Sequence, residues 1–201
     1  MRIPVDSHTA EIEIKKSRFI ALAEPLSDVS SIKERISHTR SIHPDANHVV
    51  HAAVVGVQGN QFSMSDDHEP KNTAGRPMLE ILKGSGITNI LVMVVRYFGG
   101  TLLGTGGLVK AYGDATKAVL DTLKTEELIE KTTIKIIIGY DLYEQVRNLL
   151  AEHQGASCED FATEVTIICT LPVVHVESVT SLITNLSSGQ AVIHEVKTQS
   201  S

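Results

Sequence analysis

Tryptophan is missing from this chain of 201 residues, aromatic residues make up only 4% of it, and it has just two cysteines. With so few aromatic rings, the chain has few platforms on which the bases of a single-stranded nucleic acid stack. Cys158 and Cys169 form no Cys-x-x-Cys pair, so the sequence predicts neither a zinc knuckle nor a disulfide framework. We expect both thiols to be reduced.

Long hydrophobic runs are missing too. No stretch approaches the roughly 20 apolar residues that a bilayer-spanning helix needs, and residues 1–6 lack the apolar centre of a signal peptide. The sequence therefore predicts a cytoplasmic protein without a membrane partner.

An excess of basic residues is also lacking, since the net charge is -6. A surface that binds nucleic acid strongly through its phosphates is normally basic, so no such surface is expected over the chain as a whole. The charge is uneven, with a net of -1 over residues 1–132 and -5 over residues 133–201. Any contact with a polyanion is therefore expected in the first segment.

The first 130 residues alternate between strand and helix patterns. The run over residues 87–95 is nearly all apolar and β-branched, which is typical of a strand covered on both faces. The apolar spacing predicts strands over 16–26, 47–57, 61–65 and 87–95, and helices over 29–39, 77–84 and 108–123. The predicted order is β-α-β-β-α-β-α.

The pattern restarts after a polar stretch, residues 125–133, which is interpreted as a linker or a fraying helix end. The strands predicted beyond it cover 134–140, 157–161, 164–171 and 191–197, and the helices cover 142–153 and 176–186. This β-α-β-β-α-β order is the ferredoxin-like plan, and the tail 198–201 is expected to be disordered. We therefore predict an α+β protein with two domains, residues 1–130 and 131–201.

A glycine-rich loop follows the apolar strand, over residues 96–107. Five of its twelve residues are glycine, and Thr105 lies among them; the glycines are Gly99, Gly100, Gly104, Gly106 and Gly107. Such a loop exposes backbone N–H groups, and the helix that follows adds four more at its positive end, which together favour anion binding. The alternative is that the glycines only allow tight turns and close packing. Neither the Walker A nor the dinucleotide-binding pattern is present, so ATP and NAD gain no support.

A polar loop over residues 65–77 is the second candidate. Arg76 in this loop and Arg96 at the entrance of the glycine loop are the cations that we expect to hold a phosphate or carboxylate, because a guanidinium can donate two parallel N–H bonds. The alternative is that each arginine pairs with a carboxylate of Asp66, Asp67 or Glu69. We predict that both guanidinium groups converge with main-chain amides on one crevice.

Other side chains are accessory candidates. Asp66, Asp67 and Glu69 have the oxygen ligands that Mg²⁺ prefers, but no matching second cluster is evident, so no metal or other cofactor is predicted. His48 and His51 lie three apart on a predicted strand, which places them on opposite faces and prevents them from sharing one ion; His48 is expected to face solvent or contact a loop. No nucleophile motif occurs, so no catalytic residue is assigned.

The two loops closely resemble the Impact family, which includes the bacterial YigZ-type proteins. The matching segments are 16–20, 65–67, 69–70, 73–77, 96–100, 103–109 and 111–115, and together they cover most of residues 12–123. On this resemblance Thr73, Gly75 and Asp114 join the accessory candidates. The family usually has glycine where His68 stands, Ser-Gly at 71–72, and Cys-Trp or Cys-Tyr at 50–51, so this chain departs from the pattern at those positions.

The resemblance implies a first domain with the two-layer fold of a small ribosomal-subunit protein and of domain IV of elongation factor G. It also implies a second domain similar to domain V of that factor. Family members with known roles act in translational control by binding partners, and nucleic-acid binding has been proposed for the bacterial type.

Three functions are therefore considered. The favoured one is a non-enzymatic binding protein linked to translation, whose crevice contacts RNA or a ribosome-associated partner. The second is a metal-assisted enzyme acting on a small phosphorylated or carboxylated metabolite. In the third, the acidic second domain is an adaptor that docks a protein partner by charge complementarity.

Overall fold

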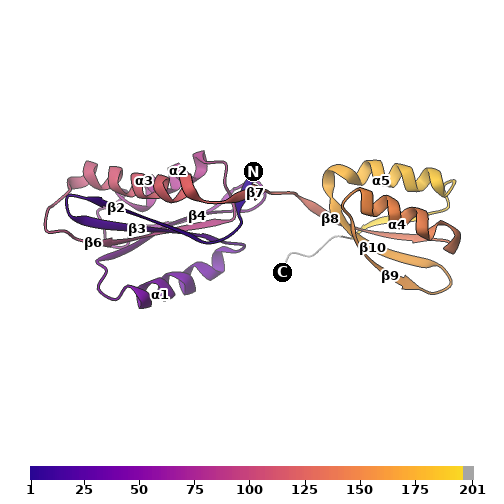
Figure 1. The fold of residues 1–201 in the computed structure, drawn as a ribbon, viewed down its shortest axis with the longest axis horizontal. Coiled ribbons are helices and arrows are strands. Elements are labelled where there is room, and N and C mark those ends of the chain that lie inside the picture. The colour runs from indigo at the N-terminus through magenta and orange to yellow at the C-terminus, as the bar shows by residue number, and fades with distance from the viewer. Residues whose placement is uncertain (197–201) are drawn as a thin grey trace. The chain divides into compact units, whose positions relative to one another are not determined.

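The computed structural model describes residues 1–196, which divide into two compact units between Leu128 and Ile129 (Figure 1). The predicted disordered tail, 198–201, and the last residue of the predicted strand 191–197 lie outside the described residues. No helix among residues 1–196 is long and apolar enough to cross a membrane.

The first unit is built on a five-stranded sheet in which every neighbouring pair of strands is antiparallel, in the order β2-β3-β6-β4-β5. The strands are β2 (His8–Ile14), β3 (Ser17–Pro25), β4 (His48–Val55), β5 (Gln61–Ser65) and β6 (Ile90–Tyr97). Residues 90–96 are all buried at the centre of this sheet, which confirms the prediction of a strand covered on both faces.

Helices cover both faces of the sheet (Figure 1), so the sheet is the middle of three layers, one more than the two-layer fold that the resemblance implies. The helices α2 (Gly75–Gly84) and α3 (Gly104–Thr122) lie on one face, and the short η1 (Val29–Ser31) leads into α1 (Ile32–Ile42) on the other. Alternation along β6 directs Val92 and Val94 toward α2 and α3, and Met93 toward α1. Arg96 continues the first series, so its side chain lies on the same face as α3.

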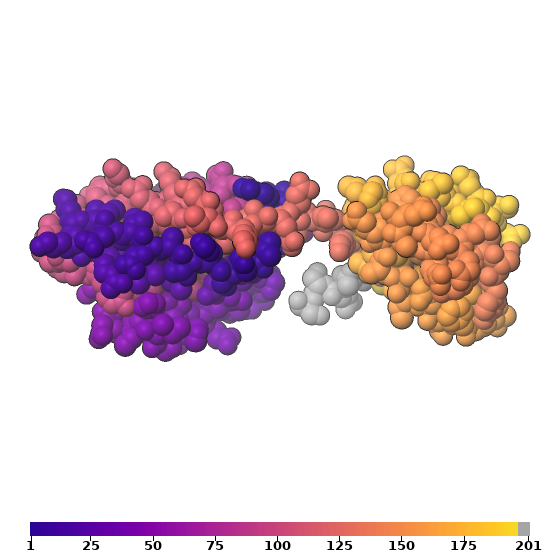
Figure 2. Space-filling model, in the orientation of Figure 1, coloured from indigo at the N-terminus to yellow at the C-terminus, as the bar shows by residue number. Residues whose placement is uncertain are grey.

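The N-terminus contains pairings that the sequence did not predict. The strand β1 (Arg2–Pro4) pairs with β7 (Thr125–Glu127), so the interpretation of 125–133 as a linker or helix end is wrong for these residues. Figure 2 shows the first residues, in indigo, against residues of much later number. The pairing joins residues more than a hundred positions apart, and three-residue strands carry no periodicity that reveals a partner. The edge strand β2 was also missed.

The second unit is a four-stranded antiparallel sheet with the order β11-β8-β10-β9. Its strands are β8 (Lys131–Ile138), β9 (Ala156–Phe161), β10 (Val165–Pro172) and β11 (Val192–Val196), and its helices are η2 (Tyr140–Leu142), α4 (Tyr143–Glu152) and α5 (Val173–Leu186). Ile136, Ile167, Val146 and Ile183 pack in one core between the sheet and the two long helices. This is the ferredoxin-like plan that the sequence predicted.

The loop between β6 and α3 is held against the turn between β2 and β3 by a close approach. A Cβ at Gly99 would lie 2.0 Å from the backbone carbon of Lys16, so only glycine fits there. The Gly99 amide also donates to Ser17 Oγ at 3.1 Å. Gly106, by contrast, has nothing within 4 Å of its ideal Cβ position.

These two glycines form a matched test of the loop. Gly99→Ala should lower the free energy of unfolding of the first domain by at least about 2 kcal/mol, because backbone has to move apart. Gly106→Ala should raise it by up to about 1 kcal/mol, because alanine favours the helix. Urea unfolding followed by far-ultraviolet circular dichroism measures both, and a stable Gly99→Ala variant would contradict the packing role.

Candidate functional site

A cavity of about 470 Å³ opens where the end of β6, the start of β4 and the N-terminus of α3 meet. It falls within the range of pockets that hold small ligands. Its walls are mostly apolar, with a few polar groups among them. The lining residues are Asn47, His48, Glu69, Pro70, Arg96, Phe98, Leu102, Leu103, Gly104, Thr105 and Leu108.

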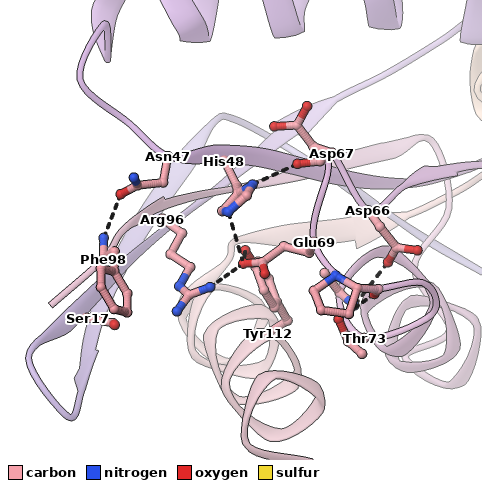
Figure 3. A network of polar contacts seen from close by, with 12 residues as sticks. Ser17, Asn47, His48, Asp66, Asp67, Glu69, Thr73, Arg96, Phe98 and Tyr112 are labelled. Atoms are coloured by element: carbon pink, nitrogen blue, oxygen red, sulfur yellow. Dashed lines mark hydrogen bonds and ion pairs between the residues drawn. The ribbon is translucent and has the colours of Figure 1, made fainter. Parts of the chain in front are cut away.

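The polar floor of the cavity is centred on the buried carboxylate of Glu69 (Figure 3). Its Oε1 accepts from Arg96 Nη1 at 2.5 Å and from the hydroxyl of Tyr112 at 2.7 Å. The side chains of Glu69 and Arg96 are only 4% and 7% exposed, so the pair is shielded from water. Arginine and carboxylate therefore neutralise each other inside the fold, as one of the alternatives for Arg96 expected.

Tyr112 is a neutral hydrogen-bond donor in this network. Burial and the neighbouring Glu69 carboxylate raise the pKa of its hydroxyl far above the ordinary value. Its ring packs edge-on against Phe19, with the centroids 5.3 Å apart. The tyrosine thus anchors the Glu69 carboxylate to α3.

His48 lies beside the ion pair and is oriented by a backbone carbonyl. Its Nδ1 donates to the carbonyl oxygen of Asp67 at 2.8 Å, which leaves Nε2 at 3.8 Å from Glu69 Oε1. The expectation that His48 contacts a loop is confirmed. His51 lies on the opposite face of the strand, where burial lowers its pKa and Nε2 contacts Ser63 Oγ at 3.1 Å.

Arg96 has donors to spare. Within residues 1–196, neither Nε nor Nη2 has a hydrogen-bond acceptor, and Nε is fully enclosed. The plane of the guanidinium lies near two rings, since its Cζ is 5.5 Å from the centre of Phe19 and 5.7 Å from that of Phe98. Because Nε is closed to solvent, an acceptor supplied from the cavity can reach Nη2 only.

The N-terminus of α3 is a second group of donors. Leu103 is its N-cap residue and makes no side-chain cap bond, and the first turn contains no acidic residue. Gly104 and Thr105 line the cavity, and Gly104 has a positive φ of 72° that favours glycine. In the part of the chain that the structure describes, the first amides of α3 therefore have no anionic side chain bonded to them.

The remaining carboxylates of the polar loop are used within the protein. Asp66 accepts from the amides of Asn72 at 2.8 Å, Ala74 at 3.1 Å and Gly75 at 2.8 Å, and so caps the start of α2. Asp67 accepts from the Val49 amide at 2.6 Å and pairs with Arg40. In the part of the chain that the structure describes, no three His, Cys, Asp or Glu side chains form a group that could hold a metal ion.

The structure gathers only some of the residues that the sequence singled out. Glu69, Arg96, Gly104 and Thr105 line the cavity, whereas the following do not: Asp66, Asp67, Thr73, Gly75, Arg76, Gly99, Gly100, Gly106, Gly107 and Asp114. Arg76 is exposed in the first turn of α2, whose N-terminus Asp66 occupies, so the two guanidinium groups are not brought together here. Thr73 closes a turn by donating to the Pro70 carbonyl at 2.6 Å.

The apolar walls were missed by the sequence analysis. Phe98, Leu102, Leu103 and Leu108 line the cavity, and Leu102 is 83% exposed. The available signal was the pair Leu102-Leu103, two large apolar residues between glycines of the loop.

The departures from the family pattern at 68 and 72 have a structural explanation. His68 and Asn72 have positive φ angles of 67° and 63°, the left-handed conformation that glycine adopts without strain. Glycine at these positions in the family therefore fits the same loop path. Asparagine adopts this conformation more readily than histidine because its short polar side chain can hydrogen-bond locally.

His68→Gly should therefore stabilise the first domain by about 0.5–1 kcal/mol. Lys71→Gly is the matched control, because the φ of Lys71 is not positive and glycine there only adds freedom to the unfolded chain. Urea unfolding compares the two. Equal effects of both substitutions would show that backbone strain at position 68 is not relieved.

The burial of the Glu69–Arg96 pair predicts how much stability is lost when one of its partners is replaced. Glu69→Gln should lower the free energy of unfolding by about 3 kcal/mol because Arg96 keeps its charge without a buried anion. Tyr112→Phe should cost about 2 kcal/mol through the lost hydrogen bond to a charged acceptor.

Glu24→Gln is the control for these variants. It breaks a partly exposed ion pair in which Arg35 Nη1 lies 2.7 Å from Glu24 Oε2. The free energy of unfolding should fall by less than about 1 kcal/mol. Thermal unfolding measured on the four proteins ranks them, and a cost for Glu69→Gln no larger than that of the control would refute the central place of the pair.

Comparisons with known proteins agree with this architecture. The Impact N-terminal domain matches residues 15–120, and a domain of unknown function (DUF1949) matches residues 136–190. An IMPACT family member of Haemophilus influenzae is 36% identical over 194 residues, covering 95% of this chain and 94% of its own. The IMPACT family member YigZ of Escherichia coli is 38% identical over 190 residues, covering 93% of each chain.

A solved structure titled "Crystal structure of an hypothetical protein" is similar over 98% of both chains, with a TM-score of 0.72 and 36% sequence identity. The matching domain covers both candidate loops and all the residues that line the cavity. The chain belongs to the Impact family.

Proposed function

We propose that the protein is a binding protein in the control of translation, and that the cavity is where it contacts a ribosome-associated protein partner. One observation carries this proposal: the cavity has a buried polar floor and an exposed apolar rim. Phe98 and Leu102 on that rim are 45% and 83% exposed. Exposed apolar side chains around a concave site are typical of an interaction surface.

The charge at the site favours a protein partner over the RNA that the sequence also allowed. The arginine that lines the cavity is already paired with Glu69, and Arg76 does not reach it. Binding to a nucleic-acid backbone depends on several unpaired basic groups that replace counterions at the phosphates. A role in translation would place the protein in the cytoplasm.

Co-sedimentation with purified bacterial ribosomes tests the proposal. The full chain should pellet with ribosomes, and Leu102→Glu should reduce the bound fraction at least tenfold because it places a charge on the apolar rim. Ile42→Glu is the matched control, since Ile42 is 59% exposed at the end of α1, on the other face of the sheet. The control should pellet like the unchanged protein.

Salt separates the two kinds of partner in the same assay. A protein contact at the cavity should weaken little between low and moderate salt, whereas a contact to RNA phosphates should weaken steeply. Failure of the unchanged chain to pellet, or equal loss in both variants, would contradict the proposal. A steep salt dependence would favour RNA over a protein as the partner.

A further inference from the structure

The cavity brings two independent groups of unused donors to one place. Arg96 is nine-tenths buried, and its Nη2 has no acceptor within the described chain, whereas its equally unpartnered Nε is closed to the cavity. The start of α3, at Gly104 and Thr105, presents amides that no side chain among residues 1–196 caps. Both groups suit an acceptor that carries negative charge.

The charge balance at the floor limits how much negative charge is accepted. Glu69 already neutralises Arg96, so the positive charge that remains is that of the helix end, equivalent to roughly half a positive charge. A phosphate dianion would place two negative charges close to the Glu69 carboxylate in a shielded site. A single negative charge fits this balance, and the two oxygens of a carboxylate can be shared between the arginine and the amides.

The walls require that the charged group be attached to something apolar. Phe98, Leu102, Leu103 and Leu108 line the cavity beside the polar floor, together with the ring of Pro70. A fully hydrated anion would leave these side chains against water. A ligand with an apolar body would cover them, including the highly exposed Leu102.

We infer that the cavity binds a monocarboxylate with an apolar body, held by Arg96 and the N-terminus of α3. The inference rests on the proposed function in taking this cavity as the binding site. Two sources present this chemistry: a free small organic acid, and the C-terminal carboxylate of a protein that ends in an apolar residue. Both place a carboxylate next to a group that the apolar walls can cover.

Titration calorimetry on the full chain tests the ligand class with matched probes. Hydrocinnamate carries a carboxylate on a phenyl body, hydrocinnamamide is its neutral counterpart, and phenyl phosphate carries a dianion. Hydrocinnamate should bind at least tenfold more tightly than either of the others. Equal binding of acid and amide, tighter binding of phenyl phosphate, or no binding of the acid at millimolar concentration would overturn the inference.

A second pair of probes distinguishes the sources. A tripeptide ending in leucine should bind with a free C-terminus and lose at least tenfold when that terminus is amidated. Tighter binding of the free peptide than of hydrocinnamate identifies a protein terminus as the source, and the reverse identifies a small acid. Equal binding of the free and amidated peptides, with no binding of hydrocinnamate, counts against the carboxylate.

Substitutions test whether hydrocinnamate binds in the cavity. Leu102→Glu, at an exposed position, should raise the dissociation constant for hydrocinnamate at least tenfold, and Arg96→Gln should do the same provided that circular dichroism shows it folded. Arg76→Gln should bind unchanged, since Arg76 does not line the cavity. An effect of Arg76→Gln equal to that of Leu102→Glu would overturn the assignment.

The two proposals can fail separately. Binding of hydrocinnamate by a chain that does not pellet with ribosomes would refute the role in translation and keep the carboxylate site. If the chain pellets with ribosomes in a way that depends on Leu102 but binds no carboxylate probe, only the assignment of a carboxylate ligand is refuted.

Discussion

The buried ion pair of Glu69 and Arg96 ties together the three segments on which the site depends. Arg96 lies next to the last residue of the central strand β6, Glu69 belongs to the polar loop before α2, and Tyr112 brings α3 to the same carboxylate. A charge in this shielded position is costly unless it is paired and hydrogen-bonded. The three segments therefore have to meet in one geometry, and the cavity forms beside their meeting point.

The pair also defines what the cavity offers to a ligand. Because the pair is neutral, the site is not a strongly basic cradle, and its attraction for anions comes from Nη2 of Arg96 and the open start of α3. Close packing of Gly99 against the turn before β3 fixes the loop that carries Phe98 and Leu102. The polar floor and the apolar wall of the cavity therefore both depend on the loop between β6 and α3.

Much of the fold follows from local patterns in the sequence. The apolar run of β6, the amphipathic helices and the β-α-β-β-α-β order of the second domain each have a period that can be read over a few residues. The pairing of β1 with β7 has no such period, because it joins the two ends of the domain. The polar residues of β2 alternate with apolar ones, but the strand lies at the sheet edge and is only half buried.

The sequence predicted several residues of the site but not which carboxylate pairs with which cation. The glycine loop and Arg96 stand out by composition, whereas sequence could not decide which carboxylate meets which cation. Asp66 turned to the amides of α2 and Asp67 to Arg40, and only Glu69 reached Arg96. Those choices depend on where β4 begins and β6 ends in the folded domain.

A crystal structure of the full chain with hydrocinnamate tests most directly whether the cavity binds a carboxylate beside the Glu69–Arg96 pair. The carboxylate is expected within hydrogen-bond distance of Arg96 and the first amides of α3, with the phenyl ring among Phe98, Leu102 and Leu108 and the Glu69–Arg96 pair intact. An empty cavity, a reversed ligand, or a Glu69 side chain displaced from Arg96 by the acid would contradict it.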